Sequence, residues 1–189
     1  MKIYNKKNIA YINVANFGDT TYQEFLEAAK QIVADKNIKG IILDLRNNPG
    51  GYIDVAVDMV GLFTDEVKTA VKLKFYDGDI SEYKTTGNGL LSGYKTVILI
   101  NEGSASASEI VAGAMKDYKL ATLIGKKSFG KGSVQEVSTY DDGSLFKYTI
   151  SYWLTPNNNS INKLGITPDK TVENLATGDK QLDTALAQF

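Results

Sequence analysis

Hydrophobic and polar positions alternate along the chain between two patterns, short apolar runs and longer segments with helical spacing. The apolar runs are bounded by turn residues and predict strands, and 38–45 is apolar almost throughout, which is typical of a strand covered on both faces. The predicted strands are 9–14, 38–45, 67–76, 95–100 and 121–125. The predicted helices are 20–36, 52–64, about 105–118 and 179–189. This alternation predicts a mainly parallel sheet with helices packed on it.

The pattern changes after residue 132. Two strands with alternating polarity flank Asp141-Asp142-Gly143, which predicts a hairpin over about 133–154. The glycine-rich segment 82–94 reads as a loop. The sequence therefore predicts an α/β fold with a hairpin region toward its C-terminal end.

Composition narrows the classes of partner. With 189 residues, 43% hydrophobic and 23% charged, the chain suits one globular domain over 1–189. A net charge of -1 gives no general attraction to nucleic acid or to anionic lipid, so neither is an expected partner. No apolar run is long enough to span a bilayer, and the first residues form no signal-peptide pattern. We expect neither a membrane segment nor a signal peptide in this chain.

The absence of histidine and cysteine excludes much catalytic chemistry. The sequence contains no residue of either type. A Ser-His-Asp triad, a thiolate nucleophile and the commonest zinc ligands are therefore impossible. Any nucleophilic hydroxyl needs a different base, and we expect no metal or other cofactor.

The stretch INEGSASASEI, residues 100–110, places three serines between a predicted strand and a predicted helix. A serine at a helix N-terminus lies near unpaired amides and the positive end of the helix dipole, which suits a nucleophile. Ser106 and Glu109 also match the S-x-x-E capping box, so Ser106 could simply cap the helix. This stretch alone leaves both interpretations open.

A second strand end, LDLRNNPGG at 43–51, carries paired glycines. Pro49-Gly50 is an ordinary signal for a type II turn, and such turns usually do no chemistry. Paired glycines also let two backbones approach and leave amides free to bind an oxygen atom. If the turn lies beside Ser106, its amides could hold an oxyanion.

The segment GKKSFGKGSVQ, residues 125–135, nearly matches a phosphate-binding loop. Gly132 stands where that motif needs a hydroxyl, and the following residues continue as a strand, which argues against nucleotide binding. Lys131 differs from its neighbouring lysines because Gly130 and Gly132 flank it and would let it lie close to another backbone. Otherwise it is a solvated surface charge.

A lysine can replace histidine as the base for a serine nucleophile. It must be neutral to do so, and burial in a dry site can lower the pKa of a lysine by several units from about 10.4. Ser106 and Lys131 are a candidate pair of this kind. Gln135 would alternate to the same strand face as Ser133 and could orient the lysine amine, although it could equally be a surface residue.

Four ordered motifs carry a resemblance to a known family. The stretches LDLRNNPGG, NEGSASASEIVAGAMKDY, GKKSFGKGSVQ and YWLTPNNNSINKLGITPD resemble the protease core of the carboxyl-terminal processing, or tail-specific, peptidases. The resemblance extends from about Ile9 to Asp169. It implies an α/β core related to the spiral ββα arrangement of the crotonase and Clp protease folds, with peptide hydrolysis as the activity and a polypeptide as the substrate.

The resemblance also assigns roles by position. It implies Ser106 as nucleophile, Lys131 as general base and Gln135 as the supporting residue. It implies an oxyanion hole from the amide of Ala107 and that of Gly50 or Gly51, and it makes Ser104 and Ser108 neighbours without a catalytic part. It implies an extracytoplasmic location, periplasmic or in the cell envelope, for the full-length protein.

The chain departs from the family in architecture. Members of the family usually carry a PDZ domain and assembly segments before the core, and we expect none of these within 1–189. Whether the protein forms a homo-oligomer is left open. The alternative to a serine endopeptidase is a non-catalytic or latent binding module of the same fold.

Overall fold

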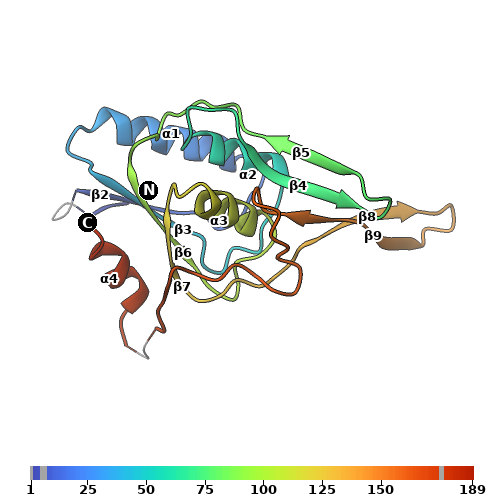
Figure 1. Ribbon diagram of the computed structural model, residues 1–189. Helices are drawn as coiled ribbons and strands as arrows, with labels where there is room; N and C mark the ends of the chain where they lie inside the picture. Colours follow the sequence, from blue (N-terminus) through green and yellow to red (C-terminus); the bar gives the residue numbers. More distant parts are fainter. Residues whose placement is uncertain (1, 5–7, 175–176) are drawn as a thin grey trace.

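A mainly parallel sheet forms the centre of the molecule (Figure 1). The computed structural model describes residues 2–4, 8–174 and 177–189. Among them the strand order is β1-β2-β3-β6-β7-β10, and every neighbouring pair is parallel except β1 with β2. The strands are β1 (Lys2–Tyr4), β2 (Ile9–Asn13), β3 (Gly40–Asp44), β6 (Lys95–Ile100), β7 (Thr122–Gly125) and β10 (Lys170–Thr171).

Helices cover both faces of this sheet. On one face lie α1 (Thr21–Ala34), α2 (Ile53–Gly61) and α3 (Ala107–Asp117), and α4 (Lys180–Leu186) packs on the other. Side chains of β3 alternate between the two sides: Ile41 and Leu43 belong to the larger core, and Ile42 belongs to the smaller core that includes Ala185 of α4. All five residues of β3 are buried, as expected for a strand covered on both faces.

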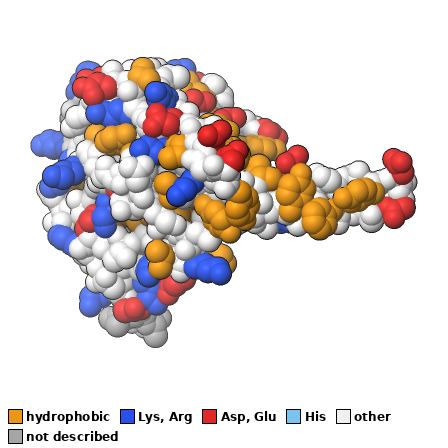
Figure 2. All heavy atoms as spheres, turned by 45° about the vertical axis from the view of Figure 1, so that its right-hand side comes forward, with side chains coloured by type: hydrophobic (Ala, Val, Ile, Leu, Met, Phe, Trp, Pro, Cys, Tyr) orange, Lys and Arg blue, Asp and Glu red, His pale blue; other side chains and the backbone are white. Residues whose placement is uncertain are grey.

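A second, antiparallel sheet extends away from the body as an arm (Figure 1). Its order is β5-β4-β9-β8, with β4 (Thr69–Phe75), β5 (Ile80–Lys84), β8 (Ser133–Thr139) and β9 (Leu145–Leu154). The predicted hairpin is confirmed as β8 and β9. Trp153 anchors the base of the arm in the core, whereas Val137 and Leu145 farther along it are exposed. Figure 2 shows apolar side chains on the surface of the arm.

The sequence-based boundaries hold for the longer elements, and the prediction was wrong at the short or polar strands. Residues 82–84, which were predicted to be part of a loop, belong to β5. This strand is an edge strand with mostly exposed side chains, and it forms through backbone pairing with β4, so it leaves no apolar pattern in the sequence. Nor did the pattern predict β1 and β10. No helix among the described residues is long and apolar enough to cross a membrane.

Candidate active site

The two strand-end segments singled out in the sequence meet at one edge of the parallel sheet. Ser106 lies between β6 and α3, and the turn with Gly50 and Gly51 lies between β3 and α2. Since β3 and β6 are parallel neighbours, their carboxyl ends reach the same edge. The Leu45 N–H donates to the carbonyl oxygen of Leu99 at 2.9 Å and extends this pairing into the turn.

Ser106 has an unusual backbone conformation. Its φ of 54° and ψ of -117° lie in a region that residues with a side chain seldom occupy, and such strain persists only where the surroundings enforce it. Strained residues of this kind cluster at functional sites, often where a strand turns sharply into a helix. The residue is partly exposed, whereas Ser104 and Ser108 are completely buried.

Ser104 and Ser108 bind the backbone of the neighbouring turn. The Ser104 hydroxyl donates to the carbonyl oxygen of Leu45 at 2.8 Å, and the Ser108 hydroxyl donates to that of Asn48 at 2.9 Å. The Ala105 N–H donates to the same Asn48 oxygen at 3.0 Å. The buried serines therefore hold the loop of Ser106 against the turn.

Gly50 lies directly against the Ser106 loop. A Cβ atom at this position would lie 2.7 Å from both the Ala105 carbonyl oxygen and the Ser106 Cβ, so a side chain cannot fit there. The φ of 102° also favours glycine. The Gly50 N–H donates to Asn48 Oδ1 at 2.8 Å, so one of the two alternative glycine amides, Gly50 or Gly51, is already engaged. The N–H groups of Gly51 and Ala107 have no hydrogen-bond acceptor among the described residues.

One cavity joins most of the candidate residues. It has a volume of about 300 Å³, and its lining includes Gly51, Ser106, Lys131 and Gln135. A bulge between Val134 and Gln135 breaks the strict alternation expected along β8, yet Ser133 and Gln135 both line the cavity. The expected nucleophile, base and supporting residue thus face a common space.

Lys131 is held through its backbone and is exposed at its side chain. Its N–H donates to Glu109 Oε2 at 2.9 Å, and its carbonyl oxygen accepts from Trp153 Nε1 at 3.0 Å. No hydrogen bond joins the Lys131 amine to Ser106 or to Gln135 in the described part of the chain, and the residue is exposed. The buried amine expected from the sequence is therefore not present in this structure.

The glycines beside Lys131 allow the close approach that the sequence suggested. A Cβ atom on Gly130 would lie 2.9 Å from the Gly165 nitrogen, and one on Gly132 would lie 2.6 Å from the Asn162 nitrogen. The Lys131 backbone therefore packs directly on the backbone of the segment that follows β9.

Glu109 is a site residue whose role the sequence did not reveal. Its side chain is completely buried and accepts four hydrogen bonds: Oε2 accepts from the N–H groups of Ser106 and Lys131, both at 2.9 Å, and Oε1 accepts from the Ser128 hydroxyl at 2.6 Å and the Gly130 N–H at 2.7 Å. One carboxylate oxygen thus fixes the backbones of the expected nucleophile and base relative to each other.

The capping box was the only sequence signal that involved Glu109. Ser106 and Glu109 do form this arrangement at the start of α3. Of the two capping-box bonds, the one from the Ser106 N–H to the Glu109 carboxylate is well formed. The Glu109 N–H donates to the Ser106 backbone carbonyl oxygen at 2.8 Å. The contacts to Gly130 and Lys131 come from a distant segment and have no local signal.

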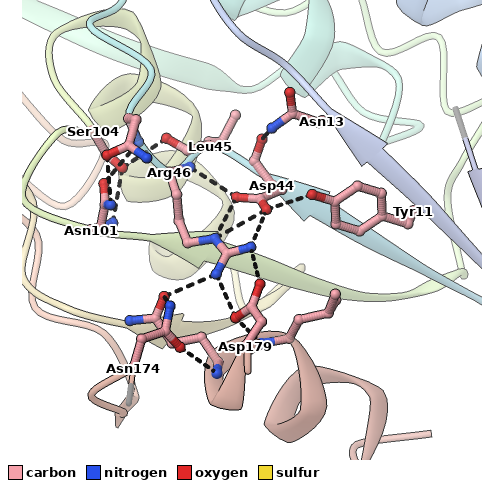
Figure 3. Close-up of polar contacts among 12 residues, drawn as sticks. Tyr11, Asn13, Asp44, Leu45, Arg46, Asn101, Ser104, Asn174 and Asp179 are labelled. Carbon is pink, nitrogen blue, oxygen red and sulfur yellow. Dashed lines mark hydrogen bonds and ion pairs between the residues drawn. The ribbon is translucent and has the colours of Figure 1, made fainter. Parts of the chain in front are cut away.

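A charged network supports the turn from the other side (Figure 3). The Arg46 guanidinium lies between Asp44 and Asp179, with ion pairs of 2.6 Å and 2.7 Å. Asp44 is nearly buried at the end of β3 and also accepts from the Tyr11 hydroxyl at 2.7 Å. Asp179 caps α4 by accepting from the Leu182 N–H at 3.0 Å. Arg46 therefore connects the turn to the C-terminal helix.

The pKa values in this network follow from burial and pairing. Burial alone lowers the pKa of Arg46, but the hydrogen bonds and charges of Asp44 and Asp179 outweigh this effect and raise the pKa overall. The hydrogen bond from Arg46 holds the pKa of Asp179 below its ordinary value. Burial, together with Asp44, raises the pKa of Tyr11. Arg46 therefore stays charged, and Asp179 stays ionised to a lower pH than an ordinary aspartate.

Comparison with known sequences identifies close relatives. Probable CtpA-like serine proteases of Staphylococcus aureus (strain COL) and Staphylococcus haemolyticus (strain JCSC1435) are each 45% identical to this chain. The matches span 90% and 89% of this chain but 34% of each relative. The chain thus spans about a third of the length of the curated relatives that it matches.

Solved structures share the fold. A photosystem II D1 C-terminal processing protease matches with a TM-score of 0.82 and 33% identity, over 87% of this chain and 42% of that chain. A lipoprotein from Streptococcus agalactiae (TM-score 0.72, 19% identity, 96% and 66% coverage) and the tricorn protease (TM-score 0.66, 20% identity, 97% and 18% coverage) resemble it in fold alone.

These relatives confirm the mixed α/β fold and the resemblance to the carboxyl-terminal processing peptidases. The model of peptidase family S41 matches residues 8–172, nearly the whole chain. The chain therefore belongs to peptidase family S41.

Proposed function

We propose that this chain is the catalytic core of a serine endopeptidase of the carboxyl-terminal processing type, which hydrolyses peptide bonds in unfolded or C-terminal segments. The observation that carries the proposal is the strained backbone of Ser106 beside a cavity that Lys131 also lines. Backbone strain of this kind costs on the order of 1 to 3 kcal/mol and clusters at functional sites, so its presence at an accessible hydroxyl supports a chemical role. Membership of the peptidase family supports the same activity.

In the proposed reaction, the Ser106 hydroxyl attacks the scissile carbonyl carbon and Lys131, in its neutral form, takes the hydroxyl proton. The tetrahedral intermediate collapses to an acyl-enzyme as the leaving amine receives that proton. Water then attacks the ester and releases the second product. The N–H groups of Ala107 and Gly51, which find no acceptor in the described part of the chain, are suited to bind the oxyanion, whereas that of Gly50 is already engaged.

Because Lys131 is exposed, bound substrate would be needed to remove its amine from water and favour the neutral form. A polypeptide that fills the cavity would cover the amine and exclude water from it, and removal from water favours the neutral form of a lysine. Gln135 lines the same cavity, which supports a part for it in orienting the amine once the amine moves toward Ser106. We infer that the general base becomes competent only when substrate is bound.

A second function, a latent or non-catalytic binding module, is favoured by one observation. Lys131 makes no hydrogen bond to Ser106 among the described residues, so the pair is not joined as it stands. Such a module would bind polypeptide in the same cavity without cleaving it. The two functions differ in whether a peptide bond is broken.

The test is hydrolysis of an unfolded protein such as casein by the wild-type chain, Ser106→Ala, Lys131→Ala and Lys131→Arg, each checked for folding. We expect cleavage only by the wild type, with a rate that rises as the solution becomes alkaline, because a lysine acts as a base only after losing its proton. Arginine keeps its charge and should not rescue activity. Cleavage at the wild-type rate by Ser106→Ala or Lys131→Arg would overturn the mechanism.

For the full-length protein we propose an extracytoplasmic location, which the family resemblance supports. Fractionation of cells that express the full-length protein, with an antibody against this core, tests the proposal. Recovery of the protein from the cytoplasmic fraction alone would contradict it.

A further inference from the structure

Lys147 is a second cation in the cavity of Ser106, and the proposed reaction does not use it. It lies on β9 directly opposite Val137 of β8, and both residues line the cavity together with Ser106 and Lys131. Opposite residues of an antiparallel pair point to the same face of the sheet. The face of the arm that carries Lys147 therefore turns toward the nucleophile.

The charged side chains that line this cavity are all cationic. Its lining contains Lys131 and Lys147 and no carboxylate, although the whole chain has a net charge of -1. Glu136 precedes Val137 on β8 and is paired with Tyr148, so it alternates to the opposite face. Lys147 is exposed and takes part in no ion pair with a described residue. By contrast, Lys126 near the same edge of the central sheet is paired with two glutamates.

Lys147 lies along the path that a bound polypeptide could follow beside β8. β8 begins at Ser133, two residues after Lys131, and it is the outermost strand of its sheet. Val137 lies four residues after Ser133, a separation of about 13 Å along a strand. The outer edge of β8 has no partner strand among the described residues, and such an edge can pair with an extended polypeptide. A chain that runs from Ser106 along β8 would pass Lys147.

We propose that Lys147 recognises a carboxylate of the bound polypeptide, about three to five residues from the bond that is cleaved. The carboxylate is either the α-carboxylate at the end of the chain or the side chain of an aspartate or glutamate. This inference rests on the proposed function, and it identifies acidic or chain-terminal segments as the preferred substrates. The ammonium group would donate a charge-assisted hydrogen bond to the carboxylate in a cavity walled partly by Val134, Val137 and Trp153.

The test uses three forms of one peptide: a free C-terminal carboxylate four residues after the cleaved bond, the corresponding C-terminal amide, and the amide with glutamate at the last position. Rates are measured as kcat/KM for the wild type, Lys147→Gln, Lys147→Arg and Lys74→Gln. Lys74 lies on β4 of the same sheet and does not line this cavity, so Lys74→Gln is the matched control.

We expect the wild type to cleave at least one carboxylate-bearing form about 10 to 100 times faster than the plain amide. Lys147→Gln should lose this preference while cleaving the amide as before, Lys147→Arg should keep most of it, and Lys74→Gln should match the wild type. Added salt should reduce the wild-type preference. Comparison of the free-acid peptide with the glutamate peptide shows which source of carboxylate is recognised.

An equal loss on all three peptides in Lys147→Gln would overturn the inference, because it would mean that Lys147 affects the site regardless of substrate charge. The inference would also be overturned if the wild type showed no preference for the carboxylate-bearing peptides. The same peptides are also tested for binding to Ser106→Ala by fluorescence anisotropy, with and without Lys147→Gln. A preference for carboxylate in binding without any hydrolysis by the wild type would support Lys147 and reject the proposed peptidase, whereas hydrolysis without preference would do the reverse.

Discussion

The Ser108 hydroxyl donates a 2.9 Å hydrogen bond to the carbonyl oxygen of Asn48, although 60 residues of sequence separate them. Both groups are buried. The bond joins the first turn of α3 to the glycine turn after β3, and Ser106 and Gly51 lie at this junction. The relative position of the proposed nucleophile and the proposed oxyanion amides therefore depends on a hydroxyl that takes no part in the proposed chemistry.

Replacement of this hydroxyl should affect stability more than chemistry. We expect Ser108→Ala to lower the free energy of unfolding by about 0.5 to 1.5 kcal/mol, the usual net contribution of such a bond. Peptidase activity should be reduced far less than in Ser106→Ala. Urea unfolding and hydrolysis of one peptide check both statements, with Ser144→Ala, at an exposed serine of the hairpin, as the control. Complete loss of activity in a folded Ser108→Ala would contradict this account.

Replacement of Glu109 by glutamine should damage both the fold and the site. A carboxamide presents one acceptor oxygen where the carboxylate presents two, and its NH₂ group would face groups that donate to Glu109 now. We expect Glu109→Gln to lower the free energy of unfolding by about 3 kcal/mol. Hydrolysis per folded molecule should also fall, because Ser106 and Lys131 lose their common anchor.

The measurement for Glu109 is kcat for the folded fraction at a temperature where the variant remains native. Glu27→Gln, on the exposed face of α1, is the control for the loss of a carboxylate. A Glu109→Gln variant with wild-type stability would show that the four contacts contribute little.

Alanine substitutions at two glycines distinguish the free-energy cost of a strained φ angle from the cost of a steric clash. Gly50 and Gly143 both have a positive φ, of 102° and 80°, but a Cβ atom meets the Ser106 loop at Gly50 and nothing within 4 Å at Gly143. We expect Gly143→Ala to lower stability by about 1 to 2 kcal/mol, and Gly50→Ala to lower it by several kcal/mol and abolish hydrolysis. Thermal unfolding and peptide hydrolysis measure these effects. Equal stability losses would show that the loop at Ser106 yields easily.

The pairing of Asp179 with Arg46 should appear in the pH dependence of stability. Because the pKa of Asp179 is lowered in the folded protein from an ordinary value of 3.8, its contribution is present above that value and is lost as the pH falls through the folded pKa. We expect Asp179→Asn to be less stable than the wild type near neutral pH. The difference should narrow below pH 3.8.

Urea unfolding at a series of pH values measures this difference. Asp183→Asn removes an exposed carboxylate from the same helix and serves as the control. A stability difference for Asp179→Asn that stays constant with pH would mean that the ion pair does not stabilise the folded state.

The sequence by itself determined the longer helices and strands and the chemical types at the site. The spacing of apolar residues predicted α1, because one face of this helix is buried and the other is exposed. The short, continuous apolar run predicted β3, because all of its residues are buried. The absence of histidine, together with the motifs around Ser106 and Lys131, made lysine a candidate base before any geometry was known. Information of this kind is local, so it can be read along the chain.

The tertiary structure decided which of these residues faces the cavity and which are buried and hydrogen-bonded. Three serines that look equivalent in sequence separate into one strained, partly exposed residue and two buried donors, because only the packing of α3 against the turn fixes which hydroxyl faces the cavity. The same packing engages the Gly50 amide. Glu109 acquires its contacts to Lys131, and Arg46 its contact to Asp179, across 22 and 133 residues. Such roles arise from contacts between distant segments, and a local pattern carries no trace of them.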